Sequence, residues 1–315
     1  MNMYDIIGDI HGYAKSLVLL LEKLGYKKNN ICYIHPERKV IFVGDFIDRG
    51  PLVFETLEIV RAMVDNGAAY AIMGNHEYNA ICFHTKSNDG KSWLRARSQK
   101  NINQHLATME AFDNSSNEWH EYLKWFKLLP LYLDMGDFRV VHACWDQEVI
   151  NYLNIRLLNG VMDDRFLHQS TKPGTIEFKA IETCLKGHEI YLPIGMSYID
   201  KDGASRNKIR AKWWIPINIE TYRSISLGND VSLPEIKVPI KQLQKLNAYS
   251  FSNVPVFIGH YWNSGIPSIM SPSVCCVDYS VAKNEKLVAY RWNGDEKLNN
   301  AHFVMQECAE IEVEN

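Results

Sequence analysis

Nine polar residues that lie just after expected strands are of types that bind divalent metal ions or phosphate groups. Carboxylate, amide and imidazole groups together suit divalent transition metals such as manganese, iron, cobalt or zinc. A single aspartate can bridge two ions, because each of its oxygens can bind one. Two ions about 3.5–4 Å apart can share a hydroxide and stabilise both oxygens of an in-line displacement at phosphorus. The nine residues are Asp9, His11, Asp45, Asp48, Arg49, Asn75, His76, His142 and His260.

Most of these residues lie in three short motifs that contain glycine. Glycine allows tight turns and a close approach of the backbone to a ligand. A single aspartate or histidine after a strand is more often a helix cap or a core residue. Three such motifs in order, followed by two further histidines at strand ends, are instead typical of a metal centre. The motifs are GDIHG at 8–12, GDFIDRG at 44–50 and GNHE at 74–77.

The elements that must position these motifs alternate between strand and helix. The run Val40 to Val43 is apolar throughout, which is typical of a strand covered on both faces. A helix is predicted from Tyr13 to Leu24, ended by Gly25, and another from Pro51 to about residue 67. With strands also expected at 4–7 and 69–73, the order predicts βαβ units with the motifs at the carboxyl ends of the strands.

The remainder of the chain is expected to complete one α/β domain, residues 1–315. Residues 84–118 are polar and basic and predict a cap-like surface segment, and residues 186–254 read as a long insertion. The acidic tail after Asn293 gives no clear prediction. Helical structure is expected at 118–129 and 146–185, single strands at 131–133, 138–141 and 256–258, and a hairpin from strands at 274–278 and 286–292.

Composition excludes several classes of partner. The net charge of −3 argues against general affinity for long nucleic acid or an anionic membrane. No apolar run approaches the roughly 20 residues that span a bilayer, and the first strand begins too early for a signal peptide. The seven cysteines form no CxxC pair, so we expect reduced thiols and a cytoplasmic location. The sequence gives no indication of an oligomeric state.

The three motifs, with His142 and His260, resemble those of the phosphoprotein-phosphatase superfamily of binuclear metallophosphoesterases. That superfamily includes Ser/Thr protein phosphatases and bacterial bis(5′-nucleosyl)-tetraphosphatases. The resemblance covers about residues 3–145 and 254–292 and omits the segment between them. It implies a four-layer α-β-β-α calcineurin-like sandwich. It also implies a phosphohydrolase that uses a hydroxide bridging two divalent metal ions, expected to be manganese, with iron, zinc, cobalt or nickel as alternatives.

The resemblance also implies a role for each motif residue. Asp9 and His11 would bind the first metal ion, and Asp45 would bridge to the second. His76 would be the general acid, oriented by Asp48, since an imidazole beside two cations keeps its proton only with a carboxylate partner. Arg49, together with Asn75, would hold the phosphoryl oxygens. The ligands of the second ion would be Asn75, His142 and His260.

Details of the motifs point to different substrate classes within the superfamily. The run from His142 to Trp145 is closer to the His-Ala-Gly of the nucleotide hydrolases than to the His-Gly-Gly of the protein phosphatases, although Cys144 replaces the glycine. The run Gly259 to Trp262 is similar to the Gly-His-Trp of the symmetrical tetraphosphatase, whereas Glu77 is the residue that protein phosphatases carry. We therefore favour dinucleoside polyphosphates or related nucleotides, with phosphoproteins as the alternative.

Two basic stretches with aromatic residues could contact the rest of a substrate. Their ordinary interpretation is a solvated cap helix and a charged hairpin. We hypothesise that at least one of Arg206 and Arg210 enters the cleft and supplies a second phosphate-binding arginine. Asp200 to Gly203 is a turn signal that lacks the other ligands of a calcium loop. The stretches are Lys91, Trp93, Arg95 and Arg97, and Arg206, Lys208, Arg210 and Lys212 followed by Trp213 and Trp214.

Two other kinds of function remain compatible with the sequence. A non-catalytic scaffold of the same fold could bind a partner through residues 186–254, but such proteins usually lose metal ligands and none is missing here. A nuclease-like phosphodiesterase could use the same metal pair, although the mildly acidic chain makes long nucleic acid a poor substrate.

Overall fold

The structure is a computed structural model of the chain. It describes residues 3–199, 205–215, 220–227, 232–246, 253–295 and 297–310. The turn signal at 200–203 lies outside the described residues. No helix in the described part of the chain is long and apolar enough to cross a membrane.

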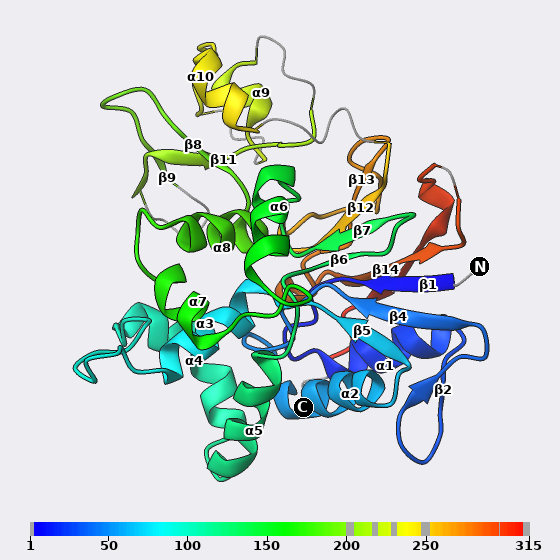
Figure 1. Cartoon of the computed structure of the whole chain (residues 1–315). Coiled ribbons are helices and arrows are strands. Elements are labelled where there is room, and N and C mark those ends of the chain that lie inside the picture. The colour runs from blue at the N-terminus through cyan, green and yellow to red at the C-terminus, as the bar shows by residue number, and fades with distance from the viewer. Residues whose placement is uncertain are drawn as a thin grey trace, which may run out of the picture.

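Two β-sheets form the centre of the molecule (Figure 1). The first has the strand order β15-β14-β1-β4-β5, in which β1, β4 and β5 are parallel and β14 and β15 run antiparallel to their neighbours. The predicted apolar strand is β4, which lies inside this sheet between β1 and β5. The bounds are β1 Met3–Ile7, β4 Arg38–Phe42, β5 Ala69–Ala71, β14 Lys286–Trp292 and β15 Phe303–Glu307.

The second sheet has the order β13-β12-β7-β6 and packs face to face against the first. Side chains alternate along β4, so that Ile41 packs between the sheets while Phe42 belongs to the larger core under the helices. Ile41 and Phe257 of the second sheet both belong to this inter-sheet core. The bounds are β6 Tyr132–Asp134, β7 Arg139–Val141, β12 Val256–Ile258 and β13 Val274–Cys276.

Helices cover the outer faces of both sheets, which gives the predicted four layers. Helices α1 and α2 lie along the first sheet, and α6 and α8 lie beside the second (Figure 1). The apolar face of α1, including Leu17 and Leu21, is fully buried in the larger core. The bounds are α1 Ala14–Lys23, α2 Val53–Asp65, α6 Gln147–Arg156, α7 Asp164–Ser170 and α8 Ile176–Lys186.

Two predictions about individual elements were wrong, and the tail, for which no structure was predicted, forms a strand. Strands β13 and β14 do not form a hairpin, because β13 pairs in parallel with β12 and β14 pairs with β1 and β15 in the other sheet. A 3-10 turn at Val281–Lys283 carries the chain between the sheets. Pro51 does not open a helix, since α2 begins at Val53 after Leu52 as its N-cap. The tail contributes a strand, β15, at the edge of the first sheet.

The segment 84–118 and the insertion lie against this sandwich. Helix α3 (Asn75–His84) leads into α4 (Gln99–Ala111), and α5 (Ser116–Phe126) follows. The insertion has a small core of its own, which includes Ile190 and Ile209. Its described elements are β8 Glu189–Tyr191, β9 Tyr198–Ile199, β10 Ser205–Arg206, β11 Lys208–Arg210, α9 Tyr222–Ile225 and α10 Ile240–Leu243. Short strands β2 (Lys27–Lys28) and β3 (Tyr33–Ile34) and 3-10 turns at Gln244–Leu246 and Asn300–His302 complete the described elements.

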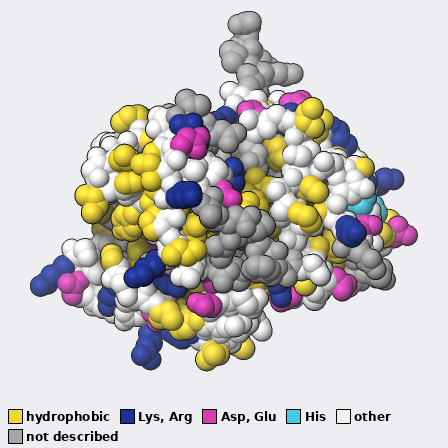
Figure 2. Space-filling model, turned by 90° about the horizontal axis from the view of Figure 1, so that it is seen from above, with side chains coloured by type: hydrophobic (Ala, Val, Ile, Leu, Met, Phe, Trp, Pro, Cys, Tyr) yellow, Lys and Arg dark blue, Asp and Glu magenta, His cyan; other side chains and the backbone are white. Residues whose placement is uncertain are grey.

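The surface on the insertion side is mixed in character. Seen from above, hydrophobic, basic and acidic side chains are interspersed over this face (Figure 2). This distribution agrees with the small net charge of −3.

Candidate metal centre

The polar motifs meet because each one follows a strand at the same end of the two sheets. The first three follow β1, β4 and β5, which are parallel. His142 follows β7 and His260 follows β12, which are parallel to each other. The backbone at these turns is left-handed at residues other than glycine, a conformation that costs about 1–3 kcal/mol at each. The positive φ angles belong to His11 (51°), Asp45 (54°), Asp48 (67°), Arg49 (68°) and His260 (68°).

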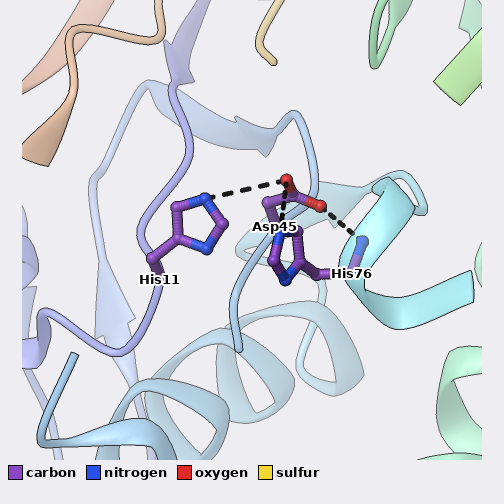
Figure 3. Close-up of side chains that lie close together, drawn as sticks. All are labelled: His11, Asp45 and His76. Atoms are coloured by element: carbon purple, nitrogen blue, oxygen red, sulfur yellow. Dashed lines mark hydrogen bonds and ion pairs between the residues drawn. The ribbon is translucent and has the colours of Figure 1, made fainter. Parts of the chain in front are cut away.

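Asp45 lies at the centre of the cluster. Its Oδ2 is 3.4 Å from Nε2 of His142, 3.7 Å from Nε2 of His11 and 4.0 Å from Nε2 of His76. Figure 3 shows His11 and His76 on either side of the Asp45 carboxylate, whose Oδ1 accepts the backbone N–H of His76 at 2.9 Å. Two groups of potential ligands share Asp45, with all their ligand atoms within 4.8 Å: His11, Asp45 and His76, and Asp45, His142 and His260.

The first of these groups differs from the predicted ligand set. The structure groups His76 with His11 and Asp45, where the sequence predicted Asp9. His76 is the most distant of the three imidazoles from Asp45, and its other nitrogen is hydrogen-bonded to Asp48. Asp9 lies beside the second group instead, where its Oδ2 accepts the backbone N–H of His260 at 3.0 Å. His76 therefore remains our predicted proton donor and Asp9 our predicted ligand.

Backbone carbonyls orient two of the imidazoles toward the cluster. The Nδ1–H of His11 donates to the carbonyl of Ile47 at 2.9 Å, and that of His142 donates to the carbonyl of Val43 at 2.8 Å. Such bonds fix the tautomer and leave Nε2 free to bind a metal ion. Nε2 of His142 also lies 3.1 Å from Oδ1 of Asn75, which brings this amide into the cluster.

Several buried polar atoms of the cluster have no hydrogen-bond partner among the described residues. They are Oδ1 of Asp9 and Nε2 of both His11 and His260. Leaving such a group unsatisfied inside a protein costs about 1–3 kcal/mol. A carboxylate oxygen and two imidazole nitrogens are good ligands for divalent transition metals. The donor set of this chain therefore fits bound metal ions.

The charges of the cluster lead to the same conclusion. Burial, with the nearby carboxylates of Asp278 and Asp45, raises the pKa of Asp9 well above its usual value. Burial also lowers the pKa of His11 to about 4, with a further contribution from His76. A bound cation would reverse the shift at Asp9, because it stabilises a nearby carboxylate in its ionised form.

Two buried carboxylates near the cluster were not among the predicted site residues. Glu77 accepts backbone N–H groups of Asp45 (2.8 Å), Phe46 (2.8 Å) and Gly74 (3.0 Å), so it ties the second motif to the third. The position of Glu77 in the GNHE motif was the sequence signal that could have identified it as a site residue. Asp278 accepts the backbone N–H of Trp262 at 2.6 Å and shapes the turn after His260. No sequence motif distinguishes Asp278.

Two motif glycines are required by the close approach of the carboxylates. A Cβ atom on Gly74 would lie 2.2 Å from Oδ1 of Asp45, and one on Gly259 would lie 2.1 Å from Oδ1 of Asp9. Both distances are far below van der Waals contact, so any side chain there would displace a predicted ligand. Gly74 and Gly259 are therefore a consequence of the site's geometry.

Asp48 holds His76 and is itself held by helix α4. Nδ1 of His76 lies 2.5 Å from one carboxylate oxygen of Asp48. The other oxygen accepts hydrogen bonds from Nδ1 of His105 at 2.8 Å and from Oγ1 of Thr108 at 2.5 Å. Burial alone would raise the pKa of Asp48, but hydrogen bonds from His105 and His76 bring it well below its usual value. Asp48 is thus an anion that can orient the His76 ring.

Replacement of His105 by alanine is expected to lower kcat about 10-fold with little change in KM, because Asp48 loses a charge-assisted hydrogen bond. His105→Asn, which retains an N–H donor, should recover part of the loss. His120→Ala is the matched control, since His120 is exposed on α5 and bonds only to the carbonyl of Ser116 among the described groups. Equal kcat values for His105→Ala and the control would contradict a positioning role.

A cavity of about 560 Å³ opens beside the cluster. Arg49 is in its wall, with the guanidinium 5.6 Å from the ring centre of Trp262, another wall residue. Both arginines of our hypothesis, Arg206 and Arg210, also line this cavity. The other predicted site residues in its wall are Asp45, Asp48, Asn75, His76 and His260, while Asp9, His11 and His142 are buried behind them.

The two basic stretches contribute unequally to this cavity. Arg95 lines it, whereas Arg97 stacks on the ring of Trp93, 3.7 Å from its centre, and donates to the carbonyl of Phe83. Trp213 and Trp214 are 2% and 4% exposed. These two buried rings are therefore not exposed to stack on a nucleotide base.

Comparison with known proteins shows similarity to one family over most of the chain. The family model described as "Calcineurin-like phosphoesterase" matches residues 4–227. This match includes the three glycine motifs and His142, extends into the insertion and ends before His260. It is thus continuous beyond residue 145, where the resemblance in the motifs stopped.

The relatives and solved structures agree with this match. The asymmetrical bis(5′-nucleosyl)-tetraphosphatase PrpE of Geobacillus sp. (strain WCH70) is 48% identical over 73 residues, 23% of this chain and 30% of that protein. The protein of the same name from Geobacillus thermodenitrificans (strain NG80-2) is 31% identical over 176 residues, 54% of this chain and 69% of its own. The chain therefore spans less than a third of the first relative.

One solved structure supports the fold alone. It is a protein serine/threonine phosphatase from Saccharomyces cerevisiae with similarity to human phosphatase PP5. It matches 99% of this chain and 81% of its own length with a TM-score of 0.50 and 12% sequence identity.

Proposed function

The chain belongs to the calcineurin-like phosphoesterase family, and on this premise we propose that it hydrolyses phosphate esters or phosphoanhydrides. The observation that carries the proposal is the position of Asp45, whose carboxylate is shared by two groups of buried ligands. A carboxylate between two such groups is suited to bridge a pair of metal ions. Enzymes of this family use a dimetal centre, and the donor set of this chain fits one.

The residues that would hold the metal ions are those predicted from the motifs, and manganese is the proposed metal. Asp9 and His11 would bind one ion, and Asn75, His142 and His260 the other, with Asp45 bridging. Such a pair supplies an activated water molecule near neutral pH and stabilises the charge that develops on phosphate. The mixture of oxygen and nitrogen ligands suits manganese, as it also suits iron, cobalt or zinc.

Five side chains of the protein would act on the substrate directly. His76, whose Nδ1 is bonded to Asp48, would give the proton on Nε2 to the leaving oxygen. Arg49 would bind the non-bridging phosphate oxygens through its planar guanidinium, together with the amide of Asn75. Arg206 and Arg210 would bind phosphate from the insertion side of the same cavity.

We further propose that residues 1–315 form one domain, in which 84–118 is cap-like and 186–254 is an insertion. The single-domain proposal is supported by a hydrogen bond from Nε1 of Trp213 to the carbonyl of Ala143 at 3.2 Å, since this bond joins the insertion to the loop after β7. A cytoplasmic location is supported by the seven cysteines, all of them free.

The proposed substrates are dinucleoside polyphosphates or related nucleotides. The curated relatives named tetraphosphatase support this choice, as does the basic wall of the cavity. The test is a panel of diadenosine tetraphosphate, phosphopeptides and cyclic nucleotides with added Mn²⁺, on a preparation whose metal content is measured. We expect turnover of the tetraphosphate. Turnover confined to phosphopeptides would overturn the substrate, and a metal-free, inert protein would overturn the reaction.

Arg210→Ala is expected to lower kcat/KM about 10- to 100-fold on both small and large phosphate substrates, which is the worth of a hydrogen bond to a charged group. Arg210 lines the cavity, and after burial its charge is the second cause that lowers the pKa of His260. The matched control is Lys212→Ala in the same segment, whose amino group donates to the carbonyl of Ser224. Unchanged activity of Arg210→Ala on both kinds of substrate would remove Arg210 from the site.

A further inference from the structure

Arg95 occupies an unusual position in the wall of the cavity beside the metal centre. Its guanidinium donates to three side-chain amide oxygens: Asn79 at 2.8 Å, Asn101 at 3.0 Å and Gln104 at 3.0 Å. The side chain is half-buried and lines the same cavity as Arg49, Asn75 and His76. Amides of two different helices, α3 and α4, therefore hold this arginine in place.

The partners of Arg95 orient its charge without neutralising it. No carboxylate among the described residues forms an ion pair with Arg95, whereas Lys186 in the same wall is paired with Glu182. A guanidinium has five N–H groups, and the three amides accept three of them. Two N–H groups and the full positive charge are left for an anion, and much of the entropy cost of ordering the side chain has already been met.

The distance from the reacting centre is set by helix α3. Asn75 and Asn79 are four residues apart on this helix and so lie on the same face, separated by about one turn, roughly 5.4 Å along the axis. Asn75 is a predicted ligand and phosphate contact, and Asn79 holds Arg95. An anion bound to Arg95 would therefore be a close neighbour of the phosphate bound at Arg49 and Asn75.

We propose that Arg95 binds the non-reacting phosphates of a polyphosphate chain, and that Asn79, Asn101 and Gln104 position it for this role. As a statement about substrate, the inference rests on the proposed phosphohydrolase function. A simple monoester has one phosphate, which the metal centre itself would hold, and leaves Arg95 without a partner. A nucleoside polyphosphate has further phosphates directly bonded to the reacting one, and these can reach Arg95.

The test compares Arg95→Ala with the wild-type chain on p-nitrophenyl phosphate and on diadenosine tetraphosphate, both with Mn²⁺. The ratio of kcat/KM for the tetraphosphate to that for the monoester should fall about 10- to 100-fold. Arg97→Ala is the matched control, because Arg97 lies two residues away but stacks on Trp93 and is not in the cavity wall. It should leave the ratio as in the wild type. An unchanged ratio in Arg95→Ala would overturn the proposal.

A binding measurement separates this proposal from the proposed function. Calorimetry without added metal should show inorganic tripolyphosphate binding to Arg95→Ala about 10- to 100-fold more weakly than to the wild type, with a far smaller change for inorganic phosphate. Arg95→Lys keeps the charge but not the planar fork, so it should lie between the two and serves if the alanine variant fails to fold.

The remaining outcomes are distinguishable. A wild-type chain that cleaves neither substrate but binds tripolyphosphate through Arg95 would overturn the proposed function and leave the phosphate-chain site standing. Tripolyphosphate binding that is equal in all variants would overturn the site. A loss of phosphopeptide turnover in Arg95→Ala as large as that of tetraphosphate turnover would overturn the assignment to a phosphate chain.

Discussion

Asp45→Asn is expected to lower metal-dependent hydrolysis of p-nitrophenyl phosphate by at least about 10³-fold. The carboxylate of Asp45 is shared by both groups of candidate ligands. Asparagine has nearly the same shape but carries one oxygen and no charge, so it cannot bridge two cations. The metal content of the purified variant should accordingly fall below that of the wild type. Both quantities are measured on one preparation, by steady-state kinetics and by elemental analysis.

The Asp45→Asn result has a matched control and a clear contrary outcome. Asp65→Asn makes the same chemical change at an ion pair with Arg61 that is exposed on α2. Surface ion pairs contribute about 0–1 kcal/mol, so this control should retain wild-type activity and metal content. An Asp45→Asn protein that keeps its activity would contradict the bridging role and with it the proposed reaction.

His76→Ala is expected to lower kcat about 10²- to 10⁴-fold on phenyl phosphate, whose leaving group must be protonated. The reason is the geometry of its imidazole, with Nδ1 fixed 2.5 Å from Asp48 and Nε2 directed toward the cluster around Asp45. On p-nitrophenyl phosphate the loss should be much smaller, because p-nitrophenolate leaves without a proton. The comparison of the two substrates is therefore the measurement.

The two substrates also separate acid catalysis from metal binding at His76. The imidazole lies in one of the groups that could hold a metal ion. If His76 were mainly a ligand, its loss would lower turnover of both esters equally and would reduce metal content. Such a result would exclude His76 as the proton donor, even though the rest of the cluster remained in place.

The three glycine motifs could be predicted from the sequence because the residues next to them determine both the strand and the turn. Each glycine motif follows a strand in the structure, because an apolar run ended by glycine dictates both the strand and its turn. The close approach of Gly74 to Asp45 shows why that glycine accompanies the ligand. His142 and His260 were predicted from their places after apolar strands, and in the structure His142 directly follows β7 and His260 follows β12 after Gly259.

The part that sequence did not predict depends on which elements become neighbours. Apolarity identified both β13 and β14 as strands, but it does not encode the sheet that a strand joins, so the hairpin was wrong. His105 and Asp278 belong to no motif and reach the site only through the tertiary fold. The polar residues Asn101, Gln104, His105 and Thr108 are spaced as one face of a helix, and this pattern was the available signal that α4 faces the site.

Helix α4 has a consequence for how this protein can change by mutation. Its one polar face supports Asp48 through His105 and Thr108, and Arg95 through Asn101 and Gln104. A substitution that tilts or slides the helix would disturb both the proposed proton donor His76, through Asp48, and the proposed phosphate binding by Arg95. Effects of paired substitutions on this face should therefore be epistatic. Selectivity could evolve independently of turnover only through changes elsewhere in the wall, such as on the strand that carries Arg210.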